Sequence, residues 1–287
     1  MNRRTALSSA ELHIYECAGR PPAFAEPEAE AFLGAWCEEG SCFLFFSAPA
    51  DRAVADFLAR HPGLALRDTH RMAYADWQGS LPEEVRVGRF RFLCRGRAQG
   101  AAAPPSPPAL VLDPGLVFGN GLHPTTRDCL RALEHAVRDR PPGRVLDLGT
   151  GTGILALAAA SLGGRVLAVD VNPLAARTAR RNVLANGLAE RVLVVSGRAE
   201  DFAGTAADLA LANLHGSVLL GLLAAGAFRR TPRWVLSGLL RGEVGEARRR
   251  LRLAGYEVRR EWAHEGVWHT LFACDRRLSG GAGSCRS

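Results

Sequence analysis

Short apolar runs recur along the chain after residue 110, separated by longer stretches with helical periodicity. Runs of this length are typical of buried strands, and strands that alternate with helices form a parallel sheet covered on both faces. The runs are Val145–Leu148, Val166–Val171, Val192–Val195, Leu209–Ala212 and Trp234–Leu236. The pattern therefore predicts the α/β class with a parallel central sheet.

Individual residues predict where one helix begins and ends, and the pattern near the C-terminus predicts a hairpin. Pro173 stands where a helix would have its first residue, and Gly187 stands where that helix should end. Near the C-terminus, two alternating segments flank a short polar turn, at Tyr256–Trp262 and Val267–Cys274. They predict an antiparallel hairpin added to the edge of the sheet.

The N-terminal part has a different, mixed pattern. Three segments there predict strands and two predict helices. The strands are expected at Glu11–Cys17, Cys42–Ser47 and Ala65–Ala73, and the helices at Glu28–Glu38 and Arg52–Arg60. This part is therefore expected to be a small α+β domain.

These patterns divide the chain into four parts. Residues 1–70 form the predicted α+β domain, and residues 111–278 form the predicted α/β domain. The segment between them, 71–110, is expected to be a linker because Gln99–Pro108 is rich in proline and small residues. Residues 279–287 are expected to be a disordered tail.

Composition places the chain among soluble globular proteins. Hydrophobic residues make up 47% and charged residues 23% of it. The formal net charge is +7, and all 36 basic residues are arginine. Residues 1–110 hold 12 Arg against 13 Asp and Glu, which gives −1, whereas residues 111–287 hold 24 against 16, which gives +8. The basic excess therefore lies in the α/β domain.

A basic excess can attract nucleic acid, but the arrangement of the arginines favours another interpretation. Four of them share one predicted helix with two glutamates, at Arg248, Arg249, Arg250, Arg252, Glu243 and Glu246. This mixture is typical of a solvated helix face. No direct nucleic-acid binding is therefore expected.

The cysteines and the apolar segments indicate in which cellular compartment the protein is expected. The 7 cysteines contain no CxxC pair and no Cys/His set with metal-ligand spacing, so we expect free thiols, a reducing compartment and no metal site. The N-terminal segment lacks the apolar stretch of a signal peptide. The most apolar window, Ser217–Phe228, is shorter than the ~20 residues that cross a bilayer and predicts a buried helix. A cytoplasmic protein without membrane contact is expected.

A glycine-rich turn follows the first strand of the α/β domain, within Arg144–Gly153. Glycines there permit a tight turn and a close approach of the backbone to a ligand, and a following helix N-terminus favours an anionic group. Dinucleotide sites need GxGxxG, but Ile154 stands where the third glycine belongs after Gly149 and Gly151. The missing third glycine argues against an NAD-binding site.

Nearby acidic residues favour S-adenosylmethionine. Asp147 would repel a diphosphate, whereas it could accept hydrogen bonds from the ammonium of a methionine moiety. Asp170 ends the second strand, where a carboxylate can bind both ribose hydroxyls; the alternative is that it only caps the helix that begins at Pro173. Ala199–Asp201 follows the third strand, where the adenine edge would lie, although these residues could equally be an ordinary acidic helix start.

Three stretches together resemble a known family. They are Asp113–Thr126, which contains FGNGLHPTT, the DLGTGTG turn at Asp147–Gly153, and Ala212-Asn213-Leu214. They resemble the ribosomal protein L11 methyltransferases (PrmA), within the seven-β-strand methyltransferases, over about residues 73–277. The resemblance implies a Rossmann-like, seven-stranded domain that uses S-adenosylmethionine to methylate amino groups of a ribosomal protein, at lysine side chains or the N-terminus.

The resemblance also implies roles for individual residues. Thr126, Gly149, Asp170 and Asn213 match the cofactor contacts of the family, in addition to Gly151 from the turn itself. The chain departs from the family at Asn120 and Leu122, which replace threonines, and at His215-Gly216, which replace Leu/Ala-type residues. The first 70 residues are similar only in length and element order.

Methyl transfer from a sulfonium is an in-line displacement that depends mainly on positioning. Asn213 is the expected catalytic residue, because its oxygens could orient an amine at the reacting end of the cofactor; an ordinary strand-end residue is the alternative. His215 could accept the proton but is more typical of a helix cap, and His123 is expected to be an N-cap.

Substrate recognition is assigned to residues 1–70, whose acidic stretch suits a basic ribosomal protein. Two alternatives stay open. One is an RNA or small-molecule methyltransferase on the same fold, although Asn213-Leu-His-Gly lacks the Asn/Asp-Pro-Pro-aromatic motif of enzymes that stack a planar amine. The other is a non-catalytic protein that binds S-adenosylmethionine. The sequence does not indicate an oligomeric state.

Overall fold

The structure is a computed structural model that describes residues 11–19, 21–22, 25–38, 40–79, 81–94, 109–226 and 230–277. Most of the proline-rich segment and the tail expected at 279–287 lie outside this part. The chain forms two compact units. Unit 1 comprises Met1–Pro82 with Asn172–Leu174, and unit 2 comprises Glu83–Val171 with Ala175–Ser287.

Unit 1 is built on a four-stranded antiparallel sheet in the order β2-β3-β1-β4. Its core holds aromatic and aliphatic side chains from the sheet and from α1, such as Phe46 and Phe57. The elements are β1 Glu11–Ala18, β2 Phe32–Glu38, β3 Ser41–Phe46, α1 Asp51–Arg60, β4 Ala65–Ala73 and α2 Tyr74–Gln78. The expected α+β composition of this part is present.

One element of unit 1 differs from the prediction. Glu28–Glu38 was expected to be a helix, but Phe32–Glu38 is strand β2, paired antiparallel with β3 from Phe32 opposite Phe46. The alanines and glutamates favour a helix locally, whereas Phe32 packs its ring against Phe46 at 5.3 Å between centroids. Tertiary pairing therefore overrides local propensity.

The cysteine prediction also needs correction. Cys37 and Cys42 lie opposite each other on β2 and β3 and form a disulfide, with Cα atoms 4.0 Å apart. Spacing along the sequence does not indicate that two cysteines lie directly across a hairpin. The other cysteines in the described part are buried and form no disulfide there, at Cys17, Cys94, Cys129 and Cys274.

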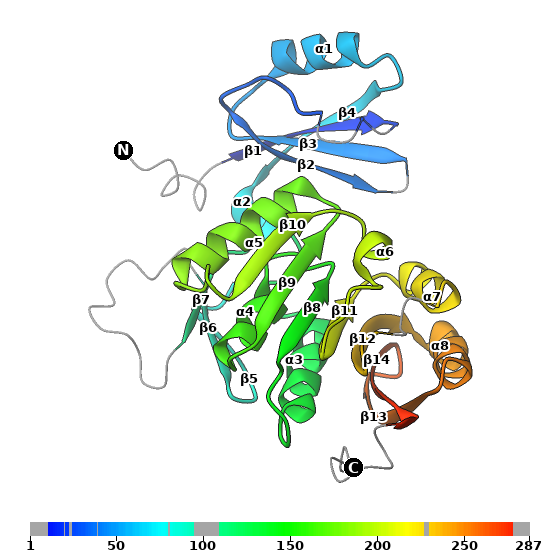
Figure 1. Cartoon of the computed structure of the whole chain (residues 1–287). Helices are drawn as coiled ribbons and strands as arrows, with labels where there is room; N and C mark the ends of the chain where they lie inside the picture. The colour runs from blue at the N-terminus through cyan, green and yellow to red at the C-terminus, as the bar shows by residue number, and fades with distance from the viewer. Residues whose placement is uncertain are drawn as a thin grey trace. The chain divides into compact units, whose positions relative to one another are not determined.

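Unit 2 is built on a seven-stranded sheet in the order β10-β9-β8-β11-β12-β14-β13 (Figure 1). The first five strands are parallel, and the C-terminal hairpin joins antiparallel to β12, as predicted. The strands are β8 Arg144–Leu148, β9 Arg165–Asp170, β10 Val192–Ser196, β11 Leu209–Asn213, β12 Arg233–Leu240, β13 Tyr256–His264 and β14 Trp268–Asp275. The expected α/β class with a seven-stranded Rossmann-like sheet is confirmed.

Helices cover the two faces of this sheet. One face packs against α3, α4 and α5, where Leu130, Leu155 and Ala179 meet strand residues in a common core. The other face packs against α7 and α8, through Leu219 and Leu251. The helices are α3 Pro124–Ala136, α4 Ile154–Ser161, α5 Pro173–Ala185, α6 Ala199–Phe202, α7 Gly216–Ala224 and α8 Arg241–Leu253. Because parallel strands share one direction, their carboxyl ends form a single edge.

A smaller sheet occupies much of the segment expected to be a linker. Strands β5 Glu84–Val87, β6 Phe90–Cys94 and β7 Leu110–Leu112 form a three-stranded sheet within unit 2. Phe92 at the centre of β6 is fully buried. The linker expected at 71–110 is therefore too long. The residues just before the proline-rich stretch form β5 and β6, and β6 pairs with β7.

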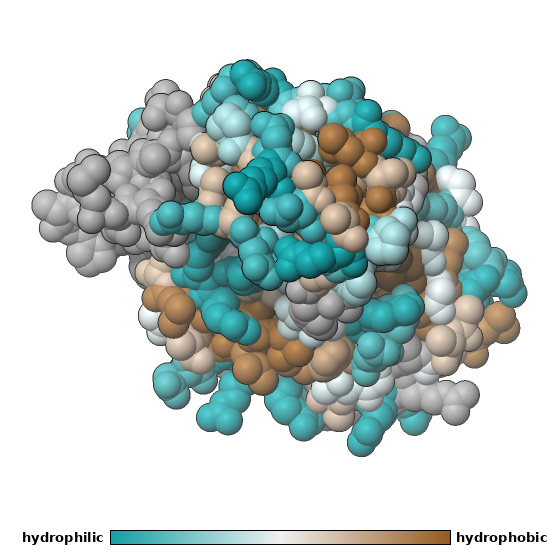
Figure 2. Space-filling view, turned by 90° about the horizontal axis from the view of Figure 1, so that it is seen from above, coloured by the Kyte–Doolittle hydropathy of each residue, from teal (hydrophilic) through white to brown (hydrophobic). Residues whose placement is uncertain are grey.

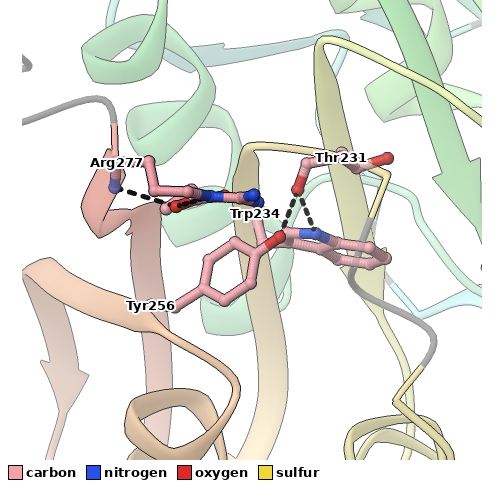
Figure 3. A network of polar contacts seen from close by, with 5 residues as sticks. Thr231, Trp234, Tyr256 and Arg277 are labelled. Atoms are coloured by element: carbon pink, nitrogen blue, oxygen red, sulfur yellow. Dashed lines mark hydrogen bonds and ion pairs between the residues drawn. The ribbon is translucent and has the colours of Figure 1, made fainter. Parts of the chain in front are cut away.

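A polar network holds the last strands of unit 2 together (Figure 3). The carbonyl oxygen of Thr231 accepts hydrogen bonds from Trp234 Nε1 at 2.9 Å and from the Tyr256 hydroxyl at 2.7 Å. Burial raises the pKa of Tyr256 to about 12, so its hydroxyl stays a donor. The network links the loop before β12 to the start of β13.

A buried arginine stands at the amino end of the same sheet. Arg233, 2% exposed, donates from Nε to the carbonyl of Asp208 at 3.0 Å and from Nη1 to that of Ala136 at 2.8 Å. Its Nη2 lies 3.4 Å from the carbonyl oxygen of Pro141. One guanidinium thus joins three separate segments of unit 2.

Hydrophobic side chains also reach the surface. On the face seen in Figure 2 they form separate patches among hydrophilic residues. Trp36 and Leu66 in unit 1 are 40% and 47% exposed, and Leu193 in unit 2 is 64% exposed. No helix in the described ranges is long and apolar enough to span a membrane.

Candidate functional site

The predicted site residues gather at the carboxyl edge of the seven-stranded sheet. Gly149 and Gly151 follow β8, Asp170 ends β9, and Asn213 ends β11. Since β8 lies between β9 and β11, these residues sit on neighbouring strands. Thr126 comes from the first turn of α3 and is 1% exposed.

The glycine turn connects β8 to α4 through a backbone that favours glycine. Gly149, Gly151 and Gly153 have φ of +72°, +55° and +85°, in the left-handed region. The amide of Gly151 donates to Asp170 Oδ2 at 2.9 Å. Asp170 is therefore fixed against the turn at the tip of the neighbouring strand, and its role toward ribose hydroxyls stays a prediction.

A second loop closes over this turn. The Thr152 hydroxyl donates to the carbonyl of Gly119 at 2.7 Å, and the Thr152 amide donates to that of Phe118 at 3.1 Å. A Cβ atom on Gly151 would stand 2.5 Å from the Phe118 oxygen, so only glycine fits there. Phe118 to Gly121 and the glycine turn, distant in sequence, thus form one backbone cradle.

Asn213 and Thr126 lie close together on the other side of β8. Asn213 Nδ2 lies 3.4 Å from the Thr126 hydroxyl oxygen, toward which it donates. The Asn213 backbone continues into Leu214, whose amide donates to the carbonyl of Ser237 on β12 at 3.1 Å. The side chain of Asn213 is therefore held between the start of α3 and the end of β11.

Asp147 lies beneath the turn and is fully buried. Its Oδ2 accepts from the Thr150 hydroxyl at 2.6 Å, while Oδ1 meets no hydrogen-bond donor in the described part of the chain. Burial raises the pKa of Asp147 to about 7, and the Asp170 carboxylate contributes to the rise against the lowering effect of Thr150. A buried carboxyl with an unsatisfied oxygen can accept a donor from a ligand ammonium.

The two histidines near the site stand at helix starts. His123 is the N-cap of α3, where its Nδ1 accepts from the Thr125 amide at 3.4 Å and lies 2.7 Å from the Thr125 hydroxyl. This confirms its predicted capping role. Burial and then His264 lower its pKa. His215 occupies the N-cap position of α7, and its Nδ1 lies 2.8 Å from the Ser217 hydroxyl.

The acidic residues expected near adenine lie at the end of β10. They form the first turn of α6, with Glu200 exposed. The backbone amide of Glu200 itself, followed by Arg198, lowers the pKa of this carboxyl. Their role toward a cofactor stays a prediction.

Asn182 on α5 and Asn186, directly after the end of that helix, support the site and were not predicted. Asn182, 1% exposed, donates to the carbonyls of Asp113 and Thr152, each at 2.9 Å, and accepts from the Asp113 amide. One turn later, Asn186 exchanges two hydrogen bonds of 2.7 Å with the backbone of Val111. The available sequence signal was a pair of asparagines four residues apart at the end of a predicted helix.

The donor set suits S-adenosylmethionine. The cradle offers backbone amides of glycines, whose lack of a Cβ atom leaves room for a ligand. Asp170 offers a carboxylate for ribose hydroxyls, and Asp147 offers an unsatisfied buried oxygen for an ammonium. In the described part of the chain, no group of three or more His, Cys, Asp or Glu side chains could hold a metal ion. The residues therefore fit a cationic, amino-acid-bearing nucleoside.

Comparison with known proteins agrees with the cofactor that the site residues suit. Residues 73–275 match the family described as ribosomal protein L11 methyltransferase (PrmA). The chain is 39% identical over 211 residues to the ribosomal protein L11 methyltransferase of Pelotomaculum thermopropionicum, which covers 71% of this chain and 67% of that protein. It is 33% identical over 244 residues to that of Thermus thermophilus, which covers 83% and 88%. In two further relatives, the match spans 56% and 50% of their length.

A solved structure supports the fold. The ribosomal protein L11 methylase of Lactobacillus delbrueckii subsp. bulgaricus superposes with a TM-score of 0.57 at 24% identity, over 68% of this chain and 99% of that one. The family match covers the glycine turn, Asp170, Asn213 and the Thr126 segment. The chain therefore belongs to the ribosomal protein L11 methyltransferase (PrmA) family, and its predicted identity as an S-adenosylmethionine-dependent methyltransferase is confirmed.

Proposed function

We propose that this chain transfers methyl groups from S-adenosylmethionine to amino groups of ribosomal protein L11, at lysine side chains, at the N-terminus or at both. The family match over residues 73–275 is the observation that carries the proposal. A ribosomal-protein acceptor places the reaction in the cytoplasm.

The cofactor supplies a methyl group on a positively charged sulfur. Asp170 and the cradle around Gly149 and Gly151 hold its nucleoside, and Asp147 faces its ammonium. Asn213 and Thr126 form a pair 3.4 Å apart, at the end of β11. Asn213 orients the acceptor amine there, and Thr126 contacts the cofactor. A displacement of this kind needs the nucleophile about 3–3.5 Å from the methyl carbon.

A lysine ammonium must lose its proton before it can react, because it has no free electron pair. Removal from water lowers the pKa of an amine. His215 stands at the start of α7, two residues after Asn213, within the same edge of the sheet. Water or His215 accepts the proton in this proposal.

Unit 1 is proposed to recognise the acceptor. It contains none of the cofactor-site residues. Unit 1 holds 7 Arg against 11 Asp and Glu, which gives a net charge of −4, whereas the rest of the chain holds 29 against 18, which gives +11. An acidic stretch between Arg20 and Arg52 complements a basic ribosomal protein.

Labelled methyl transfer tests the acceptor. The purified chain is incubated with methyl-labelled S-adenosylmethionine and recombinant L11, either unchanged or with every lysine replaced by arginine. The chain itself contains no lysine, so methyl-lysine in the product can come only from the acceptor. We expect label on L11 and its reduction or loss with the lysine-free protein. In a parallel incubation, ribosomal RNA replaces L11. Label on the RNA, with no label on either form of L11, would contradict the proposal.

Asn213→Ala tests the positioning role. We expect turnover to fall more than cofactor affinity, because the proposed contact is at the reacting end. Single-turnover rates and calorimetric S-adenosylmethionine binding separate the two effects. Asp139→Ala, at an exposed position away from the site, is the control. Unchanged turnover in Asn213→Ala would make this asparagine purely structural.

A further inference from the structure

On one face of the central sheet, the described part of the chain places only the short helix α6 over the region of β8, β9 and β10, where it packs against β9. The connection from β10 to β11 contains only α6, which has 4 residues. Four residues of helix are about 6 Å long, too short to cover neighbouring strands. In Figure 1, β8, β9 and β10 face the viewer with no helix in front of them. Parallel sheets are ordinarily covered on both faces.

The side chains on this open face are arranged in rows. Arg144 pairs with Arg165 across β8 and β9, and Arg191 lies beside Arg165 just before β10. Two residues further along, Leu146, Leu167 and Leu193 form a second row in the same register. Alternation along a strand places each arginine and its leucine on the same face.

These two rows line a hollow of about 420 Å³. Leu146 is buried at its floor, whereas Leu193 at its rim is 64% exposed. The hollow also includes Glu190, together with small residues at Thr205, Ala206 and Ala207. The surface therefore combines an apolar floor with a cationic end.

The arginines retain donors for a partner. Arg144 Nε lies 3.7 Å from Asp208, and Arg191 donates one N–H to the carbonyl of Gly163 at 3.2 Å. In the described part of the chain, the Arg165 side chain has no partner and is exposed. Glu190 is the carboxylate in the lining, and Asp208 is already engaged by Arg144. Positive charge therefore remains centred on Arg165 and Arg191.

We propose that this face, defined by Arg144, Arg165, Arg191, Leu146, Leu167 and Leu193, docks an amphipathic helix of a partner protein, with its apolar stripe on Leu193 and the partly buried Leu167 and its carboxylates over the arginines. From β8 to β10 the face is two strand spacings wide, about 9.5 Å, which matches the diameter of one helix. Acidic side chains complement the row of guanidinium groups.

Two other partners fit less well. An added strand would need the edge of β10, where Arg180 Nη2 already donates to the Val194 carbonyl at 3.1 Å. A nucleic-acid backbone would use the arginines but leave the leucine row uncovered. The face lies at the amino ends of the strands, opposite the cofactor site, so a docked helix leaves that site unobstructed.

Synthetic peptides test the proposal with the full chain. The probe is a fluorescent helical peptide of about 18 residues with a leucine stripe and glutamates at one end. One control peptide has the same composition in scrambled order, and a second has lysine in place of glutamate. We expect the chain to bind the first peptide by fluorescence anisotropy and neither control.

Variants locate the binding. Arg165→Glu and Leu193→Asp should each weaken binding of the glutamate peptide about ten-fold or more. Arg165→Glu should also bind the lysine peptide more tightly than the unchanged chain does. Arg140→Glu and Leu253→Asp, which make the same changes at exposed positions elsewhere in unit 2, should have no effect.

Three results would overturn the proposal. The first is equal binding of the amphipathic and scrambled peptides, and the second is no binding of either. The third is single-stranded RNA binding that Arg165→Glu abolishes and Leu193→Asp leaves unchanged, which would make the face a phosphate-binding surface. S-adenosylmethionine affinity, measured alongside, should be the same in all variants.

Discussion

Asp147 is a carboxyl group in a setting that disfavours its charge. It is fully buried, and its pKa is raised to about 7, far above the ordinary value of 3.8. Between about pH 4 and pH 7, the Asp147 carboxyl is therefore protonated in the folded protein and ionised in the unfolded chain. By linkage, this group stabilises the fold at low pH, and its contribution is lost as the pH rises through that window.

Asp147→Asn should remove this pH dependence. Urea unfolding at pH 5 and pH 7, without cofactor, should show the unchanged chain losing stability relative to the variant as the pH rises. The carboxyls with lowered pKa, such as Glu84 and Glu246 at about 2, titrate below this window. A constant difference between the two proteins at both pH values would contradict the raised pKa.

Asp170 should contribute to affinity rather than to folding. Its replacement by alanine removes a charge-assisted acceptor for ribose hydroxyls, so S-adenosylmethionine binding should weaken by about 1.5–3 kcal/mol. Calorimetry measures the affinity, and thermal melting confirms that the variant is folded. Asp139→Ala, at an exposed loop position, is the matched control. Unchanged affinity in a folded Asp170→Ala protein would remove this residue from the site.

At the level of elements, the sequence predicted the parts whose periodicity and burial agree. The five parallel strands, the C-terminal hairpin and β4 at Ala65–Ala73 were all expected. The error at Glu28–Glu38 arose because helix-forming residues there pair with a strand nearby in space. The support from Asn182 and Asn186 was missed because their partners lie 69 and 75 residues away. Local patterns carry no information on such pairings.

The hairpin offers a stability test at this scale. Tyr256→Phe deletes the hydroxyl that donates to the Thr231 carbonyl, while Trp234 Nε1 still satisfies that oxygen. The loss should therefore be moderate, about 1 kcal/mol of unfolding free energy. Urea denaturation with an unchanged m-value measures it. A loss several times larger would mean that the hydroxyl supports more than this one contact.

At the scale of the whole molecule, the position of β5 and β6 changes the design of a truncation. A chain that begins near Ala109 lacks the strands that pair with β7. A chain that begins at Glu83 keeps them and retains all the proposed cofactor contacts. We expect residues 83–287 to fold and bind S-adenosylmethionine but to lose methylation of L11.

Thermal melting with and without S-adenosylmethionine, together with methyl transfer to L11, checks this prediction. The full chain is the control for both measurements. If the truncated protein methylates L11 at the full rate, unit 1 has no role in recognition, and the basic unit 2 must bind the acceptor alone.

The chain contains no lysine, and the buried guanidinium of Arg233 shows a position where lysine could not replace arginine. A lysine ammonium at this position could not direct donors along three divergent lines, so the three carbonyls of Asp208, Ala136 and Pro141 would lose their common partner. Amine-reactive dyes and crosslinkers find no lysine side chain on this protein. Exposed arginines can be recoded to lysine to provide attachment points, whereas position 233 has to keep its planar, five-donor side chain.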